Sequence, residues 1–202
     1  MVILDVSVVN VALPSIRNDL GFSPIDLQWI VNAYTLTFAG FLLLGGRAAD
    51  LLGHQRVFVA GLTLFAVASL AGALSDSQLS LILARGVQGL GGAVVAPATL
   101  SILTTSFTEG PARNRALGYW GAMGGAGGAA GALLGGVLTE AFGWPSILLI
   151  NVPVAGGIAL GALLFIRASS APASRRENTT LWARLRSPPA SCSSPSPSCG
   201  PT

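Results

Sequence analysis

The sequence predicts an all-α membrane protein. Hydrophobic residues make up 51% of the 202 residues and charged residues only 9%, whereas a soluble domain carries about 25% charged residues. The apolar runs are long and continuous, unlike the alternating strands of ~10 residues that build a membrane barrel. These two observations exclude a soluble globular domain and favour membrane-spanning helices.

Six spans are predicted, in the order 1–16, 27–45, 57–74, 79–105, 117–138 and 147–166. Runs 27–45 and 57–74 hold no charged residue, and each is about long enough to cross the ~30 Å hydrocarbon core of a bilayer. Run 1–16 is closed by Pro14 and gives roughly 24 Å of helix. This shortness predicts that the true first span begins upstream of Met1.

The basic residues between the spans predict the orientation. Segments 46–56, 106–116 and 167–202 hold nine arginines, whereas segments 17–26, 75–78 and 139–146 hold only Arg17, and lysine is absent. Cytoplasmic loops carry the excess of positive charge. We therefore expect a multi-pass protein of the cell membrane with loop 46–56 and both chain ends in the cytoplasm.

The composition changes after residue 166. Residues 167–202 hold six prolines, nine serines, five arginines and both cysteines, a composition typical of disordered segments. The domain prediction is a six-helix unit at 1–166 followed by a disordered tail at 167–202, with a frameshifted reading of the tail as an equal alternative. Cys192 and Cys199 indicate neither a metal site nor a fixed disulfide.

A short polar segment separates the second and third predicted spans. It concentrates glycine and charge in residues 46–56, namely Gly46, Arg47, Asp50, Gly53 and Arg56. This Gly-x-x-x-Asp-x-x-Gly-x-x-Arg pattern resembles the signature loop between spans 2 and 3 of the major facilitator superfamily. The resemblance implies a cytoplasmic conformational latch, with Asp50 at a helix end and Arg47 and Arg56 as its charge partners.

Asp5 and Arg85 are the ionisable residues well inside the predicted spans. Such charges cost several kcal/mol in a bilayer and usually face a bundle interior or an aqueous cavity. The stretch from Asp5 through Asn10 to Pro14 resembles the first-span motif of drug:proton antiporters in the superfamily. The resemblance implies that Asp5 exchanges a proton for substrate; the alternative is that Asp5 simply lies near the membrane surface.

Arg85 begins a second motif, Arg85-Gly-Val-Gln88-Gly89. Helical spacing places Arg85, Gln88 and Gly89 on one face, and the pattern resembles the fourth-span motif of the family. Because arginine does not deprotonate, we expect Arg85 to hold a nearby carboxylate or an anionic ligand. The alternative is an arginine that extends to the outer membrane interface.

Glycines and prolines mark the expected helix-packing and hinge positions. The glycines are frequent in the fifth span, and close helix approach is the reason to keep them in a helix; ordinary packing is the plainer alternative. They resemble the span-5 antiporter motif, although Ala132 stands where that motif has proline. The predicted positions are Gly127, Gly131, Gly135, Gly136, Pro14 and Pro153.

The segment from Trp144 through Asn151 to Pro153 resembles the start of span 6 in the 14-span drug:proton antiporter branch, with Ser146 in place of a second tryptophan. Trp144 as an interfacial anchor is the plainer interpretation. Four motifs in this order imply the N-terminal six-span half of a major-facilitator fold, built of two inverted three-helix repeats.

The implied activity is proton-coupled efflux of drugs or small metabolites by alternating access. The expected partners are the lipid bilayer, a small amphipathic substrate, protons and a missing C-terminal half, with no nucleic acid, no cofactor and no metal. The alternative is a non-transporting fragment or a half-subunit that needs a partner. An intramembrane enzyme is disfavoured because the predicted spans hold no His, no Cys and no acidic pair.

Overall fold

The structure of the chain is a computed structural model that describes residues 1–107 and 109–165. The described part contains helices and no strand. In chain order the helices are α1 (Val2–Leu20), α2 (Pro24–Leu52), α3 (His54–Ala73), α4 (Gln78–Ser106), α5 (Pro111–Phe142), α6 (Pro145–Leu149) and α7 (Asn151–Phe165). The predicted tail at 167–202 lies outside the described residues.

Five helical segments are long and apolar enough to cross a membrane. They are α2, α3, α4, α5 and the segment Pro145–Ala162, which joins α6 to most of α7. The helical membrane class is thereby confirmed. Helix α1 is not among the five; its 19 residues, about 28 Å of helix, include Asp5, Arg17 and Asp19.

Pro14 does not close the first helix, so that boundary prediction is wrong. Helix α1 continues to Leu20 and ends at Gly21, whose φ of 66° is left-handed. Glycine adopts this conformation without the cost that a Cβ brings, and it commonly ends helices. Proline inside a membrane helix is tolerated because neighbouring helices and local adjustments compensate for its missing hydrogen bond.

The predicted loop at 46–56 is also wrong. Helix α2 runs to Leu52 and α3 begins at His54, leaving Gly53 alone between them with a φ of 96°. Gly46, Arg47 and Asp50 therefore lie in the last turns of α2. Polar residues suit a helix end that reaches water as well as they suit a loop, and the single glycine makes the turn.

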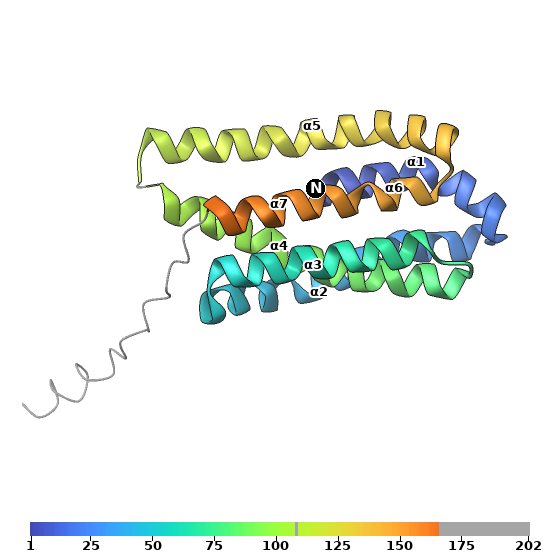
Figure 1. Cartoon of the computed structure of the whole chain (residues 1–202), viewed down its shortest axis with the longest axis horizontal. Helices are drawn as coiled ribbons and strands as arrows, with labels where there is room; N and C mark the ends of the chain where they lie inside the picture. The colour runs from blue at the N-terminus through green and yellow to red at the C-terminus, as the bar shows by residue number, and fades with distance from the viewer. Residues whose placement is uncertain (108, 166–202) are drawn as a thin grey trace, which may run out of the picture. The chain divides into compact units, whose positions relative to one another are not determined.

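Small residues let the helices approach closely. The most extensive contacts join α2 to α4, α3 to α4 and α1 to α5, and Figure 1 shows these helices running alongside one another. A Cβ at Gly45 of α2 would overlap the Ala93 carbonyl oxygen of α4, and one at Gly91 of α4 would lie 2.8 Å from the Phe65 backbone nitrogen of α3. Such contacts replace the hydrophobic effect, which is weak between helices in lipid.

The last predicted span is interrupted. Helix α6 ends at Leu149 and α7 begins at Asn151, with Ile150 between them. Pro153 has no N–H to donate to the Leu149 carbonyl four residues earlier, which removes one helical hydrogen bond at this point. Prediction of one continuous span at 147–166 missed this break.

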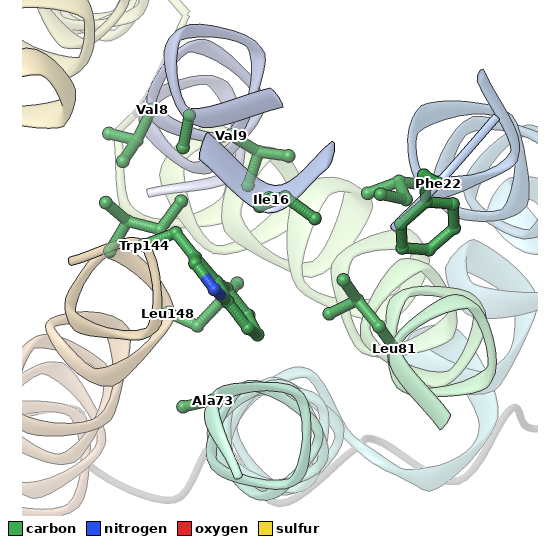
Figure 2. Packing of buried hydrophobic residues seen from close by; sticks show 11 residues of the cluster. Val8, Val9, Ile16, Phe22, Ala73, Leu81, Trp144 and Leu148 are labelled. Atoms are coloured by element: carbon green, nitrogen blue, oxygen red, sulfur yellow. The ribbon is translucent and has the colours of Figure 1, made fainter. Parts of the chain in front are cut away.

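An apolar cluster fills the space between α1, the start of α2, α3, α4 and α6. Figure 2 shows Trp144 and Leu148 in the space between the α1 side chains on one side and Ala73 and Leu81 on the other. The buried members are Val8, Val9, Ala12, Ile16, Phe22, Ile30, Ala73, Leu81, Trp144, Ile147 and Leu148. Trp144 also donates from Nε1 to Asp19 Oδ2 at 2.6 Å, which ties the start of α6 to the end of α1.

Candidate functional site

Asp5 is buried at the centre of a polar cluster inside this apolar framework. Its exposed fraction is 1%. Arg85 Nη1 donates to Asp5 Oδ2 at 2.7 Å, while Gln88 Nε2 at 2.8 Å and Asn151 Nδ2 at 2.6 Å both donate to Asp5 Oδ1. The carboxylate therefore accepts hydrogen bonds from two different helices, α4 and α7, while it sits on a third.

Arg85 is equally buried, and it makes four contacts. Besides Asp5, it donates from Nη1 to Gln88 Oε1 at 2.7 Å and from Nε to the Ile30 carbonyl at 3.4 Å. Its guanidinium carbon lies 4.5 Å from the centre of the Tyr34 ring, a cation–π distance. With 1% of its surface exposed, Arg85 points into the bundle rather than along the helix toward an interface.

Gln88 extends the cluster to α3, because its Nε2 also donates to Ser69 Oγ at 2.8 Å. Six residues are connected in this way and form the Asp5 cluster: Asp5 of α1, Tyr34 of α2, Ser69 of α3, Arg85 and Gln88 of α4, and Asn151 of α7. All six are buried. The cluster joins five helices through polar side chains.

The two charges in the cluster depend on each other. Moving a single charge out of water costs several kcal/mol, and a buried pair is tolerable only with good geometry and further hydrogen bonds. Asp5 and Arg85 satisfy both conditions, since their 2.7 Å contact is supplemented by the Gln88 and Asn151 amides. Removal of either side chain would leave the other as a buried charge without its counter-ion.

Asn10, predicted to share the site with Asp5, lies elsewhere. It is exposed, and its Nδ2 donates to the Val6 carbonyl of its own helix at 2.9 Å. The structure instead brings in Tyr34, Ser69 and Asn151. Asn151 stands in the span-6 motif, which was a usable signal, whereas Tyr34 and Ser69 are single polar residues within apolar runs and gave none.

The glycine positions of α5 separate into two groups. A Cβ at Gly131 would lie 2.8 Å from the Leu4 carbonyl oxygen, and one at Gly135 would lie 3.0 Å from the Val8 Cα. The backbone of α1 therefore packs closely against α5 at both glycines. A Cβ at Gly127 would meet nothing within 4 Å, and one at Gly136 only Val11 at 4.0 Å. The proline positions, Pro14 and Pro153, are exposed within α1 and α7.

The charged residues at the α2–α3 turn pair differently from the prediction. Asp50 Oδ1 lies 3.6 Å from His54 Nε2, and no ion pair in the described part of the chain joins Asp50 to Arg47 or Arg56. Both arginines are exposed. Gln55 in the same turn donates to the Ala162 carbonyl of α7 at 3.1 Å, which links this end of α3 to the last helix.

Comparison with known families identifies the architecture. The sequence matches the Major Facilitator Superfamily over residues 1–194. The chain belongs to this superfamily. The match confirms the expected family and, with the apolar helices, a multi-pass membrane protein of major-facilitator type. The match also continues past residue 166, into the segment predicted to be a tail.

Several curated proteins of the family are similar to this chain. The cephamycin export protein CmcT of Amycolatopsis lactamdurans is 53% identical over 92% of the chain and 37% of its own length. The puromycin resistance protein pur8 of Streptomyces alboniger is 47% identical over 83% and 33%. The methyl viologen resistance protein SmvA of Salmonella typhimurium is 43% identical over 76% and 31%. The chain spans about a third of the length of these relatives.

Proposed function

We propose that the chain forms the proton-coupling helical unit of a transporter that exports small amphipathic compounds in exchange for protons. The observation that carries this proposal is the Asp5–Arg85 pair, which is buried at 1% exposure and held by amides from two helices. Ionisable residues at such positions in membrane proteins mark ion and proton pathways. Asp5 carries the proton, and Arg85 and Gln88 respond to its charge.

The proposed coupling follows from the hydrogen bonds around Asp5. As a carboxylate, Asp5 holds α4 through Arg85 and Gln88 and holds α7 through Asn151. Protonation weakens these charge-assisted bonds, which are about twice as strong as neutral ones. Proton binding therefore changes the relative stability of two helix arrangements. A substrate that binds one of these arrangements more tightly is then exported by energy from the proton gradient.

The names of the relatives support the substrate class. They cite cephamycin, puromycin and methyl viologen, which differ widely in structure. We propose that the transporter containing this chain exports antibiotics or similar toxic small molecules across the plasma membrane. Puromycin is a suitable probe, because the name of one relative that can supply the rest of the transporter cites it.

The function is tested in a fusion transporter, in which this chain replaces the matching segment of the puromycin resistance protein pur8. Asp5→Asn is expected to abolish proton-driven export of puromycin, because an amide of nearly the same shape cannot carry the proton. Export is measured as probe accumulation in cells with and without a protonophore, with membrane abundance determined by immunoblot.

Glu140→Gln is the matched control, because Glu140 is an exposed acid near the end of α5 and outside the Asp5 cluster. It should export as the unmodified fusion does. Wild-type proton-driven export by the Asp5→Asn fusion would overturn the proposed role of Asp5.

We further propose that the α2–α3 turn faces the cytoplasm, with both ends of the chain on that side. Four arginines support this orientation: Arg47 and Arg56 near the turn, and Arg113 and Arg115 at the start of α5. Figure 1 shows the α2–α3 turn and the start of α5 at the same end of the helices. The proposed latch at this turn consists of Asp50 and its partner His54, with Gly53 making the turn between the two helices.

The orientation is tested by cysteine labelling in a variant whose Cys192 and Cys199 are replaced by serine. Leu52→Cys, at the end of α2, and Leu74→Cys, just after α3, place thiols beyond opposite ends of α3, at sites of similar exposure, 66% and 68%. An impermeant maleimide added outside intact cells should label the Leu74→Cys protein and leave the Leu52→Cys protein unlabelled until the cells are opened. The reverse pattern would invert the proposed topology.

A further inference from the structure

Asn151 connects the Asp5 cluster to the last helix. It is the first residue of α7, is 1% exposed, and donates from Nδ2 to Asp5 Oδ1 at 2.6 Å. Among the described residues, no other hydrogen bond joins α7 to the cluster. Within the described residues, this amide is therefore the direct hydrogen-bonded link between the Asp5 carboxylate and α7.

The backbone next to Asn151 is suited to movement. Ile150 separates α6 from α7, and Pro153 cannot supply the hydrogen bond to the Leu149 carbonyl. An open apolar groove lies beside the break and is lined by Leu138, Phe142, Leu149, Ile150 and Pro153. A shift at the break would therefore require less repacking than a shift within a continuous, fully packed helix.

The chemistry of an amide explains why this position carries asparagine. A charged carboxylate only accepts hydrogen bonds, and the Asn151 Nδ2 donates to it. A protonated carboxyl also donates one, and in a buried site that O–H needs an acceptor. Gln88 Oε1 already accepts from Arg85, whereas the hydrogen bonds of Asn151 within the described residues use only Nδ2. Rotation of the Asn151 amide would present its Oδ1.

We propose that Asn151 positions the Asp5 carboxyl in both of its charge states and thereby transmits protonation to the α6–α7 break. This inference rests on the proposed function of Asp5 as the proton carrier. Asn151 is thus a positioning residue that acts through Asp5. When its amide rotates, α7 moves with it.

Among residues 1–107 and 109–165, the ionisable groups that face Asp5 are Arg85 on α4, Tyr34 on α2 and the terminal amine of Met1. Helices α6 and α7 contain no ionisable residue, and those of α3, His54 and Arg56, lie in its first turn, far from Ser69. On α5 the ionisable residues are Arg113, Arg115 and Tyr119 near its start and Glu140 near its end, whereas α5 approaches the backbone of α1 at Gly131 and Gly135. A pH response that depends on Asn151 therefore reports on Asp5.

The test compares Asn151→Leu with Asn151→Gln in the fusion transporter. Leucine is similar in size but forms no hydrogen bond. Proton-driven export of puromycin should therefore fall about tenfold, and the pH at which this export is half-maximal should shift by about one unit. Both effects are the size expected for the loss of one charge-assisted hydrogen bond. Glutamine supplies both a donor and an acceptor and should restore part of the activity. Substrate exchange without a pH gradient should persist in both variants.

Two controls separate this inference from the proposed function. Asn32→Leu makes the same change at an exposed position of α2 and should leave the pH profile unchanged. In an Asp5→Asn background, Asn151→Leu should cause no further change in pH response, because no proton remains to be transmitted.

A pH profile unaltered by Asn151→Leu, or an equal loss of driven export and exchange with no shift in pH, would overturn the role of Asn151 while leaving Asp5 as the proton carrier. Full proton-driven export by Asp5→Asn would instead overturn the proposed function.

Discussion

Replacing Arg85 with methionine is expected to lower the free energy of unfolding by about 3–5 kcal/mol. The substitution removes the counter-ion of Asp5 at a site where both side chains are buried and 2.7 Å apart. It also leaves the Gln88 Oε1 without its donor. Methionine is comparable in length, so the loss reflects an uncompensated charge more than an empty cavity. Chemical unfolding of the purified chain in detergent micelles measures the effect.

The double variant Asp5→Asn, Arg85→Met gives this prediction its control. Removing both charges should recover most of the lost stability, because the penalty belongs to the unpaired carboxylate and not to the missing guanidinium. Arg17→Met, made at an exposed arginine of α1, should change stability by less than about 1 kcal/mol. An equal effect of Arg85→Met and Arg17→Met would mean that the buried pair does not exist.

Gly131→Ala is expected to destabilise the chain by about 1–3 kcal/mol, the usual cost of overpacking. Its Cβ would lie 2.8 Å from the Leu4 carbonyl oxygen and 2.9 Å from the Ser7 Cβ, so α5 and α1 must separate. Because Leu4 precedes Asp5 directly, this separation should also disturb the Asp5 cluster. Thermal unfolding of the purified variant measures the loss.

Gly127→Ala is the matched control, one turn earlier on the same helix. A Cβ at Gly127 meets nothing within 4 Å, and alanine favours helix over glycine by about 1 kcal/mol. This variant should be as stable as the parent or slightly more stable. Equal destabilisation by both substitutions would show that the glycines of α5 serve helix flexibility and not the contact with α1.

The sequence was sufficient to anticipate the polar centre of the site because burying a charge is so costly. Asp5 and Arg85 were singled out as ionisable residues inside apolar runs, and helical spacing added Gln88; the structure places all three in contact. Here the physical rule is strong, since charged residues within spans must face inward and find partners.

The remaining members of the cluster could not be found in this way. Ser69 and Tyr34 are isolated polar residues in apolar helices. Ser69 contacts Gln88, 19 residues away in the sequence, and Tyr34 contacts Arg85 of another helix. Asn151 contacts Asp5 across 146 residues of sequence. Such long-range contacts depend on how the helices pack, which local periodicity does not encode. Asn10 illustrates the reverse case, a motif residue that faces away from the cluster.

The predicted helix boundaries at Pro14 and at 46–56 were wrong for a related reason. Glycine and charge at 46–56 indicated a loop, yet helical hydrogen bonds continue through Asp50 to Leu52, and only Gly53 has a conformation incompatible with the helix. Pro14 indicated a helix end, yet the helix continues for six more residues. Local signals of this kind are overridden when tertiary packing stabilises the longer helix.

The central claim, that Asp5 carries the coupling proton, is tested most directly by flux in vesicles. The fusion transporter is reconstituted, and probe flux is measured with an imposed pH gradient and, separately, as exchange without one. The Asp5→Asn variant should lose all acceleration by the gradient and retain exchange, because its neutral amide keeps the binding site but carries no proton. Gradient-driven flux by Asp5→Asn equal to that of the parent would contradict the account.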